Sequence, residues 1–332
     1  MSSYDLSRLS PYEREAWDRI QRWRLDQASQ RSLVPAPIRK KTKQIGDLAA
    51  RGWNATPGTA QVGEIVGKVL AGGNEALTDA VAASLQRDRI LQAARDAGGV
   101  VDELSDLRTL DLRIIDAILP SLNLRYALTS AATGAGSGFV AGGGTAAIVG
   151  TAGVAAAPGG LAVGGALAGD VVATLALAAR VVTHYAGYYG YDTREEGEKA
   201  VLLAVIGVGV AGEGAAKQAA LLHVRQVAMM IARRSAWKEL GEEAIVKLIQ
   251  ALFTKLSVRL TQRKLAQALP IAGIAAGAGL NYSLMRKVGT AAAFMYRERF
   301  LIDKYTLDFD EPTPDLADVI DVEVIEKPPA ID

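Results

Sequence analysis

The chain contains no cysteine and only two histidines among its 332 residues. Without cysteine there can be no disulfide scaffold, no thiol nucleophile, no zinc finger and no iron–sulfur site. His184 and His223 are far apart in the sequence, and neither has a potential metal ligand four residues later. We therefore expect two ordinary hydrogen-bonded histidines and predict neither a metal nor a cofactor.

An excess of either charge sign is also lacking, because 37 Lys and Arg residues nearly balance 36 Asp and Glu residues. A protein that binds nucleic acid over its whole length is normally basic, and here aromatic residues are not interleaved with the basic ones. We therefore expect no nucleic-acid partner. The first residues carry many charges and no continuous apolar run, so they do not resemble a secretory signal. This favours a location in the cytoplasm or at the inner face of the cell membrane.

Sustained alternation of apolar and polar residues is almost absent, whereas helical spacing recurs along the chain. Ser10 followed by Pro11 is typical of a helix start, and Pro120 of a helix stop. The sequence therefore predicts an all-α fold, a multi-helix bundle. The expected helices span residues 11–28, 38–53, 58–70, 74–85, 105–118, 193–207, 215–234, 240–260 and 270–300.

Composition divides the chain into three parts. We expect a loosely attached N-terminal helical section at 1–120, an apolar helical core at 121–302 continuous with it, and an acidic disordered tail at 303–332. The tail has ten acidic residues against two lysines, and such a segment buries too little apolar surface to fold. Residues 217–300 carry fourteen Lys and Arg against four Glu, so the tail could fold back onto them. The sequence leaves the tail's partner undetermined.

One segment, residues 126–169, contains 44 consecutive uncharged residues, of which 13 are Gly and 14 are Ala. Its length allows a hairpin of two membrane crossings with a turn near Pro158. Its composition favours a hairpin that is buried or inserts only peripherally, because Gly and Ala contribute little to membrane insertion. Both alternatives stay open from the sequence.

A tyrosine-rich block, residues 184–192, follows this apolar region and suggests a polar pocket. The candidate ligand residues are Asp170, Arg180, Tyr185, Tyr189, Asp192 and Asn281. Charges in an apolar helix need partners or water, so these groups could form a polar site or an interfacial aromatic belt. The alternative is core packing at a helix end, with Gly190 as the residue that terminates the helix.

Two further patterns concern helix surfaces. The basic residues Lys247, Lys255, Arg259 and Arg263 flank an apolar stripe and are candidates for contact with an anionic membrane surface, although an ordinary bundle helix has the same pattern. The run Gly207-Val208-Gly209-Val210-Ala211-Gly212 matches a dinucleotide-binding fingerprint on paper. It lacks the acidic residue that such a site needs, so we interpret its glycines as positions of close helix packing.

Taken in order, several marks resemble the EcsC family of bacterial proteins over roughly residues 11–301. They are Tyr12-Glu13-Arg14-Glu15-Ala16-Trp17 with Trp23, the Gly/Ala-rich middle ending in Asp170, the block from Arg180 to Tyr189-Gly190-Tyr191-Asp192, and the series Pro270, Gly273, Gly277 and Asn281. The resemblance implies a helical protein often encoded near an ABC transporter, with no established catalytic residues.

We therefore expect a non-enzymatic, peripherally membrane-associated protein with an accessory or scaffold role. Its expected partners are an anionic membrane surface and a membrane complex such as an ABC transporter. The alternatives are an enzyme with a polar pocket near Asp170, Arg180 and Asn281, or a soluble bundle that binds a small molecule or a lipid.

Overall fold

The computed structural model describes residues 6–29, 81–122, 126, 160–211, 215–232 and 274–307. In these parts every regular element is helical and there is no strand, which confirms the all-α prediction. The long helices are α1 (Pro11–Ser29), α8 (Gly160–Tyr188), α9 (Glu196–Val210), α10 (Ala215–Ala232) and α12 (Ile274–Tyr305). Shorter elements are η1 (Leu6–Arg8), α4 (Arg87–Asp96), η2 (Leu104–Thr109) and α5 (Leu112–Ile118).

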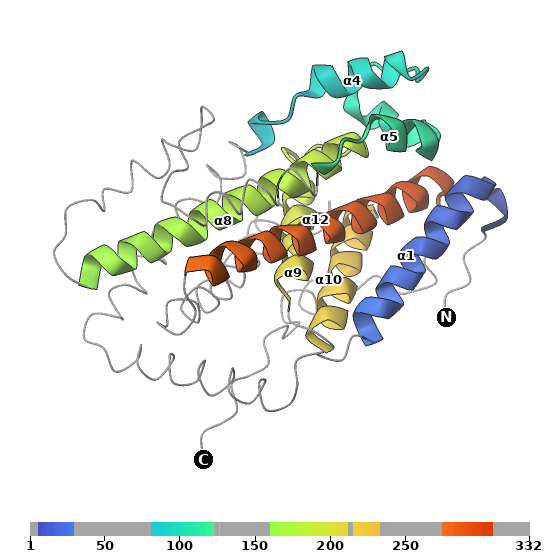
Figure 1. Cartoon of the computed structure of the whole chain (residues 1–332). Coiled ribbons are helices and arrows are strands. Elements are labelled where there is room, and N and C mark those ends of the chain that lie inside the picture. Colours follow the sequence, from blue (N-terminus) through green and yellow to red (C-terminus); the bar gives the residue numbers. More distant parts are fainter. Residues whose placement is uncertain are drawn as a thin grey trace.

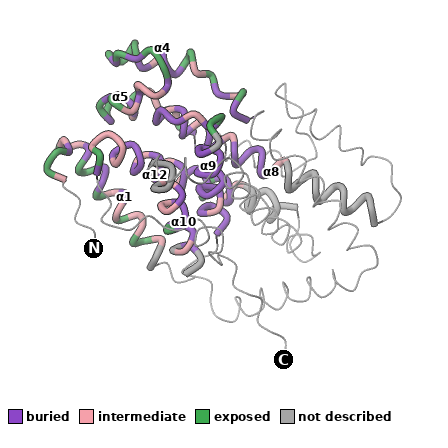
Figure 2. Tube along the Cα trace, turned by 180° about the vertical axis from the view of Figure 1, so that it is seen from behind, coloured by how far each residue is buried: buried purple, intermediate pink, exposed green. Residues whose placement is uncertain are grey.

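Helix α9 lies at the centre of the described bundle and packs against α8, α10 and α12 (Figure 1). Residues 200–206 are all buried, and Figure 2 shows the buried residues concentrated around this helix. A helix that is apolar on all sides must be enclosed by other helices to remain in water. α9 is therefore the core element on which the surrounding helices assemble.

The glycine-rich end of α9 is a close helix contact, as the sequence predicts. A Cβ on Gly209 would lie 2.4 Å from Val288 Cγ2 and 2.6 Å from Val288 Cα, on α12. Only glycine allows two backbones to approach this closely. Residues 207–210 of the dinucleotide-like pattern are thus the last turn of the helix Glu196–Val210, and the residues before them are helical rather than a strand.

Helix α1 begins at Pro11, as expected, and Ser10 caps it. The Ser10 hydroxyl accepts from the Glu13 amide at 3.3 Å, while the Glu13 carboxylate accepts from the Ser10 amide at 3.1 Å, a reciprocal capping box. Trp17 and Ile20 are buried against the bundle, and α1 packs on α10 and α12. The prediction of loose attachment is therefore wrong for α1, because its apolar face completes the core.

A small group of elements, α4, η2 and α5, packs on one end of the bundle (Figure 1). The sequence predicts one helix over 105–118, but the structure divides it into η2 and α5. The division occurs at Asp111, whose side chain accepts from the Arg113 amide at 2.8 Å and caps α5. α5 ends at Ile118, just before Pro120, as predicted.

The end of α8 also follows the prediction. Gly190 has φ +85°, and the Tyr191 amide donates to the Ala186 carbonyl at 2.9 Å, which is the hydrogen bond of a Schellman cap. The glycine therefore terminates the helix and turns the chain toward α9. The rings of Tyr189 and Phe300 lie 5.9 Å apart, so the C-terminal ends of α8 and α12 meet and the two helices run parallel (Figure 1).

Several predictions lie outside the described residues. They are the helices at 38–53, 58–70 and 240–260, most of 74–85, the basic residues Lys247, Lys255, Arg259 and Arg263, and the tail from residue 308. Of the uncharged segment 126–169, the structure describes Tyr126 and the first turns of α8. Among the helices of the described parts, none combines the length and hydropathy needed to cross a membrane.

Candidate functional site

The C-terminal turns of α12 carry a dense set of charged side chains that bind other elements. The Arg299 guanidinium donates to both carboxylate oxygens of Glu198, on α9, at 2.6 and 2.7 Å, and all these groups are buried. It also lies 4.1 Å from the ring centroid of Tyr191, whose hydroxyl donates to Asp303 at 2.8 Å. Such a bidentate ion pair fixes the relative position of two helices.

A second acid, Glu13, joins the two ends of the described chain. It accepts from Lys304 at 2.7 Å and from the Tyr305 hydroxyl at 2.6 Å, while Ser10 Oγ donates at 2.8 Å. Burial opposes ionisation of this carboxyl group, but the hydrogen bonds outweigh burial and lower its pKa to about 2. Glu13 is therefore a charged anchor between α1 and α12.

Two further pairs complete this set. Arg24 on α1 donates to Glu298 at 2.6 Å, and Arg297 forms an ion pair with Asp116 on α5, which also accepts from the Tyr12 hydroxyl at 2.6 Å. In each pair both partners are at least partly buried, so the acid and the base satisfy one another. We refer to these contacts, with those of Glu13 and Arg299, as the ion-paired end of the bundle.

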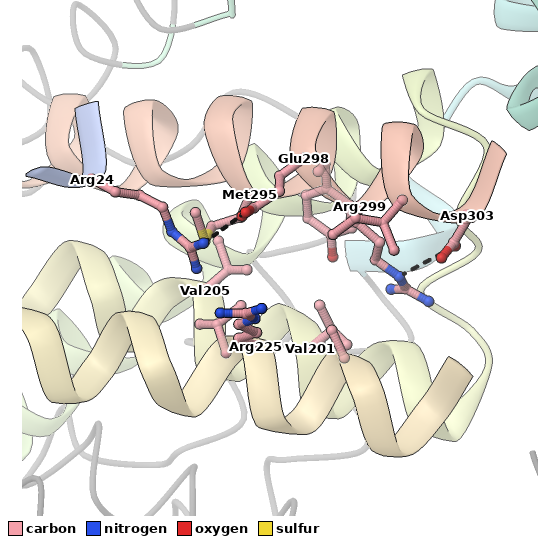
Figure 3. A pocket seen from close by; sticks show the side chains of 12 residues that line it. Arg24, Val201, Val205, Arg225, Met295, Glu298, Arg299 and Asp303 are labelled. Atoms are coloured by element: carbon pink, nitrogen blue, oxygen red, sulfur yellow. Dashed lines mark hydrogen bonds and ion pairs between the residues drawn. The ribbon is translucent and has the colours of Figure 1, made fainter. Parts of the chain in front are cut away.

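A cavity of about 40 Å³ lies between α1, α9, α10 and α12 (Figure 3). Figure 3 shows Arg24 bonded to Glu298 on one side and Arg299 facing Asp303 on the other, with Val201 and Val205 among the apolar walls. This volume is large enough to hold ordered water.

The structure divides the residues predicted to form a polar pocket into two levels. Tyr185 and Tyr189 are buried at the C-terminal end of α8, as expected for core packing. Asp170 lies nineteen residues before Tyr189 on α8, and Asn281 lies nineteen residues before Phe300 on the parallel helix α12. Because a helix rises about 1.5 Å per residue, the backbones of Asp170 and Asn281 lie at a similar height, about 28 Å from the Tyr189–Phe300 contact. The side chains of Asp170 and Asn281 are not among those described.

Asp192 belongs to the surface near the end of α8. It accepts from Arg87 at 2.7 Å and from Arg194 at 3.0 Å. Burial, meanwhile, raises the pKa of Tyr189. Asp192 is thus held between two arginines, whereas the Tyr189 phenol is enclosed in the core.

The side of α8 away from the core carries a stripe of less buried residues, which we call the outer stripe. Its members are Ala173, Arg180, His184 and Tyr188. The Tyr126 hydroxyl and His184 Nδ1 are 2.8 Å apart, so His184 is hydrogen-bonded, as the sequence analysis expects of a histidine. Arg180 Nε is buried without a hydrogen-bond partner. The outer stripe thus contains a cation that the described ion pairs leave uncompensated.

Apart from the serine cap, no local pattern in the sequence predicts the ion-paired end. Glu13 had a local signal, because it stands three residues after Ser10 in the spacing of a capping box. Glu198 and Arg299 are 101 residues apart, and no local pattern indicates that they meet. The sequence likewise does not predict the contact between Tyr126 and His184, which are 58 positions apart.

Comparison with protein families finds a match to the EcsC protein family over residues 146–301. This part of the chain, which includes α8, α9, α10 and most of α12, is EcsC-like, as the sequence resemblance predicts. The opening mark at 12–17 and Trp23 precede the matched range. No curated protein and no solved structure matches the chain.

Proposed function

We propose that this EcsC-like protein is a non-enzymatic helical protein that docks peripherally on an anionic membrane surface, at the inner face of the cell membrane, as an accessory or scaffold protein. The observation that carries the proposal is the position of the first turns of α8. Residues 160–169 lie within the uncharged segment 126–169, and Figure 1 shows this end of α8 projecting away from α1, α9 and α10.

The arrangement of charge supports the same proposal. The ion-paired end lies at the C-terminal ends of α8 and α12, where charges serve to hold helices together. The projecting end of α8 has no charged residue before Asp170. A helical protein that is apolar at one end and cross-linked by ion pairs at the other is suited to contact a bilayer with the first and keep its fold with the second.

Vesicle flotation tests the proposal. The full chain and a truncation ending at Tyr305 are mixed at low salt with vesicles of phosphatidylcholine, with and without phosphatidylglycerol. We expect flotation with the phosphatidylglycerol vesicles. Leu161→Glu, which places a charge in the first turns of α8, should reduce it.

Leu25→Glu is the matched control, because Leu25 is an exposed leucine on α1, with 68% of its surface accessible. It adds the same charge away from the projecting end and should leave flotation unchanged. The proposal fails if neither the full chain nor the truncation floats with anionic vesicles. It also fails if both glutamate variants float as the unchanged protein does.

A further inference from the structure

Arg180 is a partly buried cation on the outer stripe of α8. It lies in the apolar helix α8, followed directly by Val181, Val182 and Thr183, which are fully buried. Its Nε has no hydrogen-bond partner, and the ion pairs of the described residues do not include it. A partly buried guanidinium is costly unless an anion or water compensates it.

His184 lies on the same side of α8 as Arg180, and Tyr126 contacts His184. His184 is one helical turn further along, so both side chains leave the same face of α8 with Cβ atoms about 5–6 Å apart. The Tyr126 hydroxyl is 2.8 Å from His184 Nδ1 and orients the imidazole ring. When the hydroxyl donates to Nδ1, the ring proton is on Nε2, which can then donate to an anion.

We propose that Arg180, His184 and Tyr126 form a binding site for the phosphate group of an anionic lipid. The inference rests on the proposed membrane docking and names its ligand class. A guanidinium matches the geometry of a phosphate group better than a lysine would, because its donors form a planar fork. Arg180 would supply the charge, and His184, held by Tyr126, a directed hydrogen bond.

The surroundings favour a lipid over free phosphate. From Arg180 toward its N-terminus, the outer stripe of α8 continues to Ala173, and the chain has no charge between Arg180 and Asp170. From Asp170 to Arg180 the helix rises about 15 Å, half the thickness of a bilayer's hydrocarbon core. Acyl chains attached to a phosphate at Arg180 would therefore lie along apolar turns that lead to the projecting end of α8.

The test measures binding of monomeric short-chain phosphatidylglycerol by calorimetry, with glycerol phosphate and inorganic phosphate as further probes. We expect Arg180→Leu to weaken lipid binding roughly tenfold to a hundredfold, the usual effect of losing a charged hydrogen bond. Tyr126→Phe should weaken it less. Arg89→Gln is the matched control, because it removes one positive charge from an exposed position on α4.

Stability without lipid gives a second readout. If the charge of Arg180 is compensated only when lipid is bound, Arg180→Leu should leave the urea midpoint of unfolding unchanged or raise it. Added lipid should then raise the midpoint of the unchanged protein but not that of Arg180→Leu. A lower midpoint for Arg180→Leu without lipid would overturn the inference, because Arg180 would then have a structural partner. The inference would also be overturned if Arg180→Leu bound lipid as tightly as Arg89→Gln does. Equal affinity of the unchanged protein for inorganic phosphate and for lipid would overturn it too.

Failure of this inference can be distinguished from failure of the proposed function. Flotation that Arg180→Leu leaves unchanged, with no binding of monomeric lipid, would overturn the phosphate site and leave membrane docking supported. Binding of monomeric lipid by a protein that does not float would support the phosphate site and overturn docking.

Discussion

Replacing Gly209 by alanine tests whether α9 and α12 are in backbone contact. The added Cβ would lie 2.4 Å from Val288 Cγ2 and 2.6 Å from Val288 Cα. Ordinary van der Waals contact begins near 3.4 Å, so the two helices must separate by about 1 Å. Side-chain rotation cannot relieve this clash, because one of the atoms involved belongs to the backbone.

Two opposing effects set the magnitude. Alanine favours a helix over glycine by about 1 kcal/mol, which would stabilise the variant. Overpacking a closely packed core costs about 1–3 kcal/mol and sometimes more, and here the displaced group is a whole helix in contact with the central one. We therefore expect Gly209→Ala to lower the free energy of unfolding by about 2 kcal/mol, measured by urea denaturation.

Other glycines supply matched comparisons. Gly98 has φ +89° and nothing within 4 Å of its added Cβ, so Gly98→Ala measures backbone strain alone and should cost about 1 kcal/mol. Gly190 combines φ +85° with a backbone oxygen, that of Leu104, at 2.8 Å, and Gly190→Ala should cost more than Gly98→Ala.

A double variant identifies the clashing atom. Val288→Ala removes Cγ2 but leaves Cα, so it should not restore the stability of Gly209→Ala. Rescue by Val288→Ala, or a Gly209→Ala protein at least as stable as the original, would refute the backbone contact.

The ion-paired end yields two further predictions. Arg299→Leu leaves the Glu198 carboxylate buried without its main partner and should lower the free energy of unfolding by about 3–5 kcal/mol. The double variant with Glu198→Leu should lose less stability than the sum of the two single variants. Additive losses in urea denaturation would contradict the pairing. Because the folded state lowers the pKa of Glu13 from 4.5 to about 2, its stabilisation is complete above pH 4.5 and is lost as the pH falls through about 2. Glu13→Gln should therefore show a weaker loss of stability over that acid range, and parallel curves for the two proteins would contradict the assignment.

Local signals in the sequence predict the elements that local interactions determine. The cap at Ser10 and Pro11 and the stop at Gly190 depend on the residues themselves and their immediate neighbours. Gly209 signals a close helix contact, but the sequence does not show that its partner is Val288 on α12. A local interaction also explains why the single helix predicted at 105–118 is wrong. Asp111 caps a new helix within the apolar pattern, and the pattern alone does not reveal that competition.

The polar contacts could not be predicted in this way, because they join distant parts of the chain. Glu13 meets Lys304 across 291 positions, and Glu198 meets Arg299 across 101. The sequence therefore suggests a basic C-terminal half, whereas the structure places Arg297 and Arg299 against acids inside the bundle. Charge counted along a sequence overestimates surface charge wherever ion pairs form between distant residues.

This pairing also bears on how the protein can meet a membrane. Arg297, Arg299 and Lys304 are engaged with acids, so they contribute little attraction to anionic lipids. Within the described bundle, Arg180 differs because its guanidinium is not among the ion pairs and it lies on the side of α8 that leads to the uncharged turns. If the bundle binds anionic lipid through its described residues, removal of Arg180 should therefore affect binding more than removal of any of the paired basic residues.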